Sequence, residues 1–200
     1  MMKFSKFILV LVIASVVTLS LVLGLTYAFY TSNDGVNTNI TTSNEDPRLV
    51  VTFNQSQYIN FNVGIPIPDN KIDEQASKSV FTINPDETKL SGKDVAITIS
   101  LVNLSIADEL KISDFKYDLI CNDGTNNSTL ANGTGASFTS QVLSDNLLPL
   151  GSLSTSNNTF DVSKDYTCTF RLWLHETGED QNSLMGKNFS GVLKVSSAYK

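Results

Sequence analysis

The hydrophobic pattern from residue 49 onward is a succession of short segments in which apolar and polar residues alternate. Alternation with a period of two places the apolar side chains on one face of an extended strand. The segments are rich in β-branched and aromatic residues, and the stretches between them carry the Asn, Gly and Pro residues that turns require. Eight or nine strands are predicted, over residues 49–54, 57–63, 79–84, 94–102, 115–121, 136–142, 159–162, 166–174 and 188–196.

This succession of strands assigns the chain to the all-β class. Two sheets closed over a common core are expected, in an immunoglobulin-like β-sandwich formed by residues 48–200. A domain of this length can bury roughly two thirds of its unfolded surface in one core. One short helix is a weaker expectation, over residues 105–112.

The first thirty residues have a different pattern. An apolar run over residues 7–30 follows Lys3 and Lys6. A helix rising about 1.5 Å per residue would let this run span about 30 Å of hydrocarbon. Positive charge favours the cytoplasmic side, and Asp34 is the first charge after the run, so residues from about 31 onward are expected outside. Residues 1–30 are therefore predicted to be a signal peptide or an N-terminal membrane anchor.

Two fates of this hydrophobic helix stay open. Its apolar core exceeds the 7 to 15 residues of a secretory signal, which favours a retained anchor. The small residues Thr26 and Ala28 favour cleavage between Ala28 and Phe29 instead. Residues 31–47 hold almost nothing that a core could bury, so they are expected to form a flexible polar linker.

The net charge argues against one class of partner. The whole chain carries −6, and removal of the two N-terminal lysines leaves 14 − 2 = 12 basic against 20 acidic side chains, or −8. An acidic surface repels phosphate backbones, so nucleic acid is not an expected partner.

The two cysteines fall on inward faces of predicted strands. Cys168 alternates with Phe170, and Cys121 alternates with Leu119. A disulfide between them would close a loop of about 48 residues and restrict the unfolded chain by roughly 4 kcal/mol. An even cysteine count in an oxidising compartment favours the bond. The alternative is two buried free thiols.

Residues suited to catalysis are sparse. His175 is the single histidine, so a His-Glu-x-x-His metal site and a two-Cys-two-His zinc set are both absent. No Gly-x-Ser-x-Gly elbow supports a serine nucleophile. His175 is expected to be a solvated hairpin residue, and Glu176, Glu179 and Asp180 an exposed acidic turn rather than a weak Ca²⁺ site. No enzyme activity, metal site or cofactor is predicted.

One possible recognition feature lies on the outward face of the strand at residues 166–174. Arg171 and Trp173 point to that face, opposite the predicted core. They could form a recognition patch, or they could be covered by a loop.

Both ends of the chain resemble the TasA/camelysin family of exported proteins of Gram-positive bacteria, which have SipW-type signal peptides. The junction at residues 24–31, Gly-Leu-Thr-Tyr-Ala-Phe-Tyr-Thr, is similar to the end of the family's signal peptide. Residues 181–195, where a Gln/Asn-rich loop and Gly-Lys lead into an amphipathic strand, are similar to its closing segment. The sequence departs from the family in having a single Gly24 and no acidic residue directly after the aromatic pair.

The resemblance implies a jelly-roll-like β-sandwich, export with signal-peptide processing, and attachment to the cell surface or assembly into extracellular-matrix fibres, as in biofilms. Expected partners are further copies of the chain or cell-surface and matrix proteins, and the membrane through residues 7–30 if these are retained. Some members of the family have been described as metalloproteases, an activity that the lone His175 does not support. The first hypothesis is therefore a structural subunit assembling by strand addition, and the alternative is a membrane-anchored binding module or adhesin.

Overall fold

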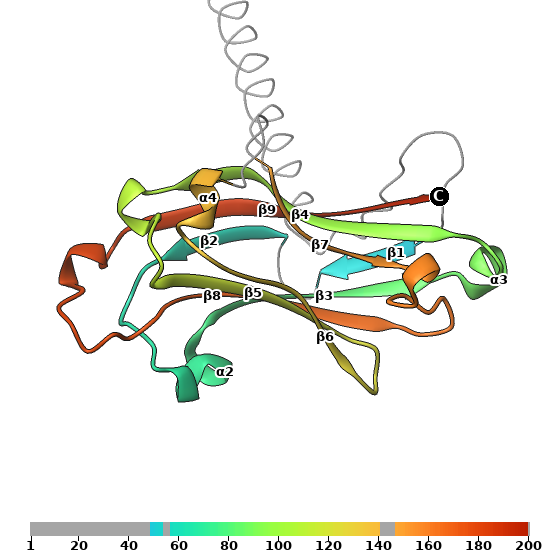
Figure 1. Ribbon diagram of the computed structural model, residues 1–200, viewed down its shortest axis with the longest axis horizontal. Helices are drawn as coiled ribbons and strands as arrows, with labels where there is room; N and C mark the ends of the chain where they lie inside the picture. The colour runs from blue at the N-terminus through green and yellow to red at the C-terminus, as the bar shows by residue number, and fades with distance from the viewer. Residues whose placement is uncertain (1–48, 54–56, 141–146, 200) are drawn as a thin grey trace, which may run out of the picture. The chain divides into compact units, whose positions relative to one another are not determined.

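The computed structural model describes residues 49–53, 57–140 and 147–199, and most of these residues lie in β-strands. Nine strands among these residues form two antiparallel sheets packed as layers (Figure 1), which confirms the expected β-sandwich. The five-stranded sheet has the order β1 (Leu49–Phe53), β3 (Ser77–Pro85), β8 (Tyr166–Leu174), β5 (Phe115–Asn122) and β6 (Asn127–Thr134). The four-stranded sheet has the order β2 (Tyr58–Asn62), β9 (Asn188–Tyr199), β4 (Val95–Ile106) and β7 (Leu148–Ser154).

Helical structure among the described residues is confined to single turns in the connections. They are α2 (Ile72–Gln75), α3 (Glu87–Leu90), α4 (Ser137–Ser140) and the 3-10 turns η1 (Asp69–Lys71), η2 (Asp108–Leu110), η3 (Thr155–Asn157) and η4 (Asn182–Leu184). The helix predicted over residues 105–112 is largely wrong. Strand β4 continues to Ile106, and only the turn η2 is helical.

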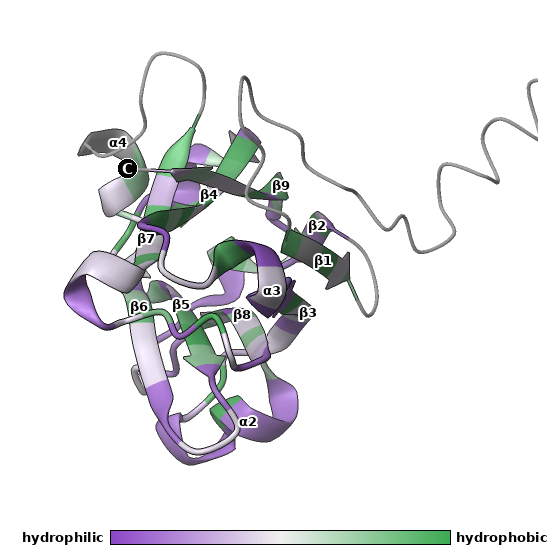
Figure 2. Ribbon diagram, turned by 90° about the vertical axis from the view of Figure 1, so that its right-hand side faces the viewer, coloured by the Kyte–Doolittle hydropathy of each residue, from purple (hydrophilic) through white to green (hydrophobic). Residues whose placement is uncertain are grey.

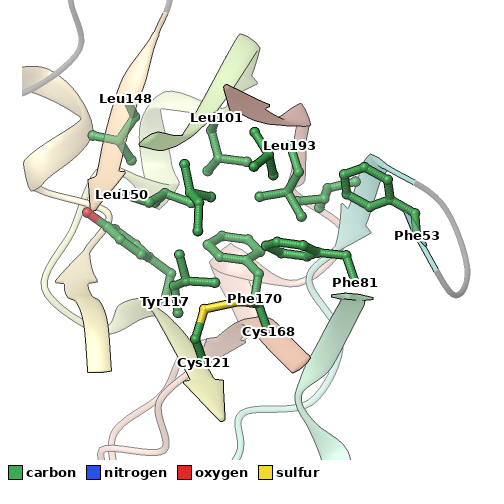
Figure 3. Packing of buried hydrophobic residues seen from close by; sticks show 14 of the residues in the cluster. Phe53, Phe81, Leu101, Tyr117, Cys121, Leu148, Leu150, Cys168, Phe170 and Leu193 are labelled. Atoms are coloured by element: carbon green, nitrogen blue, oxygen red, sulfur yellow. A yellow bond between two sulfur atoms is a disulfide. The ribbon is translucent and has the colours of Figure 1, made fainter. Parts of the chain in front are cut away.

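The core lies between the two sheets and follows the predicted alternation. In β8 every second residue from Tyr166 to Leu174 is buried, and in β3 the buried positions include Phe81 and Ile83. Figure 3 shows Phe81 and Phe170 facing leucines of the opposite sheet. The rings of Phe115 on β5 and Phe189 on β9 meet at a centroid distance of 5.8 Å, which joins the layers by aromatic packing.

Two strands were not predicted, and two predicted strands are absent. The missed strands are β6, which is mostly polar, and β7, which contains Pro149 and Gly151. Residues 136–140, the described part of the predicted strand 136–142, and residues 159–162 do not form strands. Phe138 lies in α4. Phe160 lies in a loop, and its backbone N–H donates to the carbonyl oxygen of Ser154. Both phenylalanines are buried, so the pattern located core residues and misassigned their backbone.

One glycine is required by close backbone packing. A Cβ atom at Gly135 would lie 1.9 Å from the carbonyl oxygen of Leu110 and 2.9 Å from that of Ile112. Replacing Gly135 with alanine is therefore expected to lower the free energy of unfolding by about 1 to 3 kcal/mol. The control is Gly64→Ala, where a Cβ meets no atom within 4 Å and the change should stay within about 0.5 kcal/mol. Urea denaturation measures both, and equal stability of the two variants would contradict the expected clash.

Candidate functional site

The two cysteines form a disulfide, as predicted. Cys121 and Cys168 lie directly opposite each other on β5 and β8, the third and fourth strands of their sheet. Both are fully buried beneath the aromatic core (Figure 3). The bond therefore joins neighbours within one sheet rather than the two layers. Disulfides form and persist in oxidising, extracytoplasmic compartments.

Trp173 is not an exposed recognition residue, so the patch considered for Arg171 and Trp173 is wrong. The segment between β2 and β3 crosses the outer face of the sheet and buries the indole against Ile67, Ala76 and the partly buried Ile72. Ile67 also forms an isolated parallel bridge with His175, directly after β8, and its N–H donates to the carbonyl oxygen of Leu174 at 2.7 Å. Most residues of the covering segment around α2 are hydrophilic (Figure 2).

Arg171 takes part in ion pairs instead of facing a ligand. Two nitrogens of its guanidinium donate hydrogen bonds to the carboxylate of Asp118, Nε at 2.8 Å and also Nη2. The third nitrogen, Nη1, donates to Asp73 on α2. The hydrogen bonding that Arg171 donates to the Asp118 carboxylate is the largest cause of its raised pKa. Arg171 thus fastens the covering segment to the sheet.

His175 and the acidic turn that follows have structural contacts. The His175 side chain is only partly exposed, rather than solvated as expected, and its Nδ1 lies 3.0 Å from Oδ1 of Asp69. Glu176 accepts a hydrogen bond from the N–H of Gly178, and Asp180 accepts one from the N–H of Asn182. Across residues 49–53, 57–140 and 147–199, no group of three or more His, Cys, Asp or Glu side chains is placed to hold a metal ion.

A charged contact fastens the β5–β6 hairpin to the loop before β8. Lys164 Nζ donates to Asp123 Oδ2 at 2.7 Å, and the other oxygen of Asp123 accepts from the N–H groups of Thr125 and Asn126. The Lys164 hydrogen bond, followed by these backbone bonds, holds the pKa of Asp123 well below its ordinary 3.8. The same hydrogen bond raises the pKa of Lys164 above 10.5.

The pair of Lys164 and Asp123 makes the free energy of unfolding decrease at acidic pH. A lowered carboxylate pKa contributes stability above the unfolded value of 3.8, which is lost as the pH falls through the folded value. Asp123→Asn keeps an acceptor for the two backbone N–H groups and removes the charge. The variant should be less stable than the wild type at pH 7, and the difference should shrink steadily below about pH 3.8. Urea titrations across this range decide it, and a difference independent of pH would contradict the assignment.

One lateral side of the sandwich is open. Strand β1 pairs with residues 81–85 of β3 and ends there, and the chain then continues as β2 in the other sheet. Between β2 and the first residues of β3 lies a cleft of about 230 Å³. Its lining includes Tyr58 and Asn60 from β2, Lys78 from β3, and Phe170 and Leu172 from β8. Sequence reasoning placed these residues in strands, apart from Lys78, which directly precedes the predicted strand 79–84, but gave no signal that they meet.

The opposite lateral side is closed. The edge strands β6 and β7 approach each other there, and a Cβ atom at Gly151 would lie 2.9 Å from both the Cβ and the carbonyl oxygen of Leu130. Pro149 leaves β7 without one backbone donor, as is common in edge strands. The cleft beside β2 is therefore the better candidate for an interaction surface.

The predictions for the N-terminal region lie outside the described residues. They concern the apolar run 7–30, the cleavage site between Ala28 and Phe29, and the linker 31–47. Within the part of the chain that the structure describes, no helix is long and apolar enough to span a membrane.

Comparisons with known proteins give no family assignment. No protein-family model matches the chain, and no curated protein matches it. Among solved structures, Xylanase10C from Cellvibrio japonicus in complex with xylopentaose is similar over 83% of this chain and 27% of its own, with 11% identity and a TM-score of 0.33. AvmM, which catalyses macrocyclization in alchivemycin A biosynthesis, is similar over 72% of this chain and 89% of its own, with 13% identity and a TM-score of 0.25. Likenesses this low carry no argument about function.

Proposed function

We propose that this protein is an exported structural subunit of the cell surface or extracellular matrix, whose copies assemble into fibres by strand addition. The observation that carries the proposal is the cleft beside the edge strand β2. The buried disulfide, the N-terminal apolar run and the resemblance to the TasA/camelysin family support export. That resemblance also favours a jelly-roll-like form of the sandwich.

The backbone of β2 is oriented to accept another strand. At its two ends, Leu193 N–H donates to the carbonyl oxygen of Gln57 and Val63 N–H donates to that of Lys187. The N–H and C=O groups of successive residues point to alternate sides of a strand. Those of Ile59 and Phe61 therefore also point to β9, whereas those of Asn60 and Asn62 point to the outer edge. An edge of this kind is a template for a further strand.

The donor proposed is the polar segment before β1 of a neighbouring copy. Residues 31–47 contain little that could hold them in their own core. A segment that becomes ordered only on reaching a partner gains main-chain hydrogen bonds at that moment. Assembly would then depend on release of the N-terminus by cleavage near Ala28.

Light scattering on two lengths of the chain tests the proposal. The protein beginning at Phe29 should oligomerise at high concentration, whereas a version beginning at Arg48 should stay monomeric. The shorter version retains all nine strands and the buried core, so it is expected to fold. Equal behaviour of the two, whether monomeric or assembled, would remove the N-terminal segment from the mechanism.

A variant of the acceptor strand sharpens this test. Asn60→Pro removes an outward N–H while leaving the hydrogen bonds between β2 and β9 in place. It should reduce assembly of the longer protein without unfolding it. Asn60→Thr keeps the N–H at the same position and is the matched control, which should assemble normally.

The second candidate function, a membrane-anchored binding module or adhesin, rests on the length of the apolar run. Burial of Trp173 removes the surface considered for such a module. N-terminal sequencing of the exported protein separates the candidates, because a start near Phe29 requires cleavage and a retained residue 1 requires an anchor.

A further inference from the structure

The sandwich has two chemically different ends, here named the tip and the base. The base holds the end of β3, the start of β4 and the end of β9, as the register pairs Leu49 with Pro85 and Val95 with Tyr199. The tip holds the end of β2, the start of β9 and the end of β8. In Figure 1, α3 marks the base, and the connection from β8 to β9 marks the tip.

The tip presents two exposed apolar side chains on adjacent loops. Ile65 is 79% exposed and Met185 is 42% exposed, and with Tyr58 they are the large exposed hydrophobic residues of the described chain. The loops are fastened together, because Gly186 N–H donates to the carbonyl oxygen of Val63 at 2.8 Å. Pro66 restricts the backbone of Ile65 to extended conformations. Ile65 is therefore held outward by a restrained loop.

The base presents a hollow of about 520 Å³, a size within the range of ligand pockets. Leu90, Phe160 and Val162 supply its apolar lining. Lys93, Asp94 and Asp161 carry the charges that line it. An apolar projection at one end and a partly apolar hollow at the other can meet only between different copies.

We infer that the tip of one copy, led by Ile65, inserts into the base hollow of the next. Because the two surfaces differ, each contact leaves one tip and one base unused, so the chain of copies stays open and grows as a fibre. This inference rests on the proposed self-assembly and adds a second contact to strand addition.

The position of Leu49 favours this polarity. Leu49, the first described residue, lies at the base, whereas Tyr58 and Lys78 place the acceptor cleft toward the tip half of the sandwich. A tip seated on a base therefore brings one copy's cleft near the other copy's N-terminal segment. The 17 residues 31–47 can reach up to roughly 55 Å when extended.

Charge does not drive this contact, because one cation and two carboxylates line the hollow that an acidic tip would meet. Glu176, Glu179 and Asp180 are exposed at the tip, and Lys93 at the base forms no ion pair with any described residue. Asp94 and Asp161 line the same hollow, so the apolar contact carries most of the expected affinity.

A double-mutant cycle on the exported protein beginning at Phe29 tests the contact. Ile65→Ser at the tip and Val162→Asp at the base should each raise the threshold concentration for assembly about tenfold or more. The two together should raise it no further than either alone, because both remove the same contact. Ile65→Leu is the matched control and should assemble like the wild type. Circular dichroism verifies that each variant is folded.

The outcomes separate this inference from the proposed function. Unchanged assembly of Ile65→Ser, or simple additivity in the double variant, overturns the tip-to-base contact. If Ile65→Ser assembles normally while removal of residues 29–47 abolishes assembly, strand addition stands and the tip-to-base contact fails. If Ile65→Ser impairs assembly and the truncation does not, the contact stands and strand addition fails. A wild type that never assembles overturns both.

Discussion

Replacing Cys121 and Cys168 together with alanine is expected to lower the free energy of unfolding by about 2 to 5 kcal/mol. The bond spans 47 positions of sequence, and the loop it closes contains β6, α4 and β7. On the chain-entropy model, closing such a loop restricts the unfolded chain by about 4 kcal/mol. The strands themselves should still pair, because β5 and β8 share a ladder of eight residue pairs. Guanidinium denaturation measures the loss.

Reduced wild-type protein is the control for this variant. Reduction removes the cross-link and keeps both sulfur atoms in the core, whereas the alanine variant also loses their packing. Both cysteines are fully buried, so a reductant should act slowly without denaturant and rapidly once the protein opens. If reduced and oxidised wild type unfold at the same denaturant concentration, the cross-link contributes nothing and the expected loss is wrong.

The central strands were predictable because they are buried against the core along their whole length. Strand β8 shows unbroken alternation from Tyr166 to Leu174, and both of its neighbours, β3 and β5, were predicted as well. Inward parity alone placed both cysteines on the core side. Their exact opposition required the register between two strands 47 residues apart, which no local pattern contains.

The missed strands share a position. Both β6 and β7 are edge strands, which bury fewer side chains and tolerate residues that usually end a strand. In β6 the pair Asn132 and Gly133 suggested a turn, yet the missing side chain of Gly133 leaves room for the Tyr117 ring. Strand β7 contains Pro149 and Gly151, residues that are uncommon inside strands.

The candidate site was the least predictable feature. The cleft combines β2 from one sheet with β3 and β8 from the other, so it depends on where the chain crosses between layers. The covering of Trp173 likewise depends on a connection that alternation does not describe. Alternation correctly placed Trp173 on the outward face of β8. The segment between β2 and β3 then buries it.

Removing the carboxylate of Asp118 is expected to destabilise the protein by about 3 kcal/mol or more. Asp118 lies directly opposite Arg171 in the ladder between β5 and β8, and their side chains are only 10% and 15% exposed. Truncating one partner of such a pair leaves a charge without compensation in a poorly solvated place. Asp118→Ala should therefore show a large loss in urea denaturation.

The same arginine supplies the control. Asp73 also contacts Arg171, but its side chain is 91% exposed, so Asp73→Ala should cost less than about 1 kcal/mol. Replacing both members of the buried pair, as in Asp118→Leu with Arg171→Met, should recover much of the loss from Asp118→Ala, because no unpaired charge remains. Equal losses from the two aspartate variants would mean that solvent reaches Arg171 freely. In that case Asp118 could not be what holds the Arg171 side chain in place beside Asp73 of the covering segment.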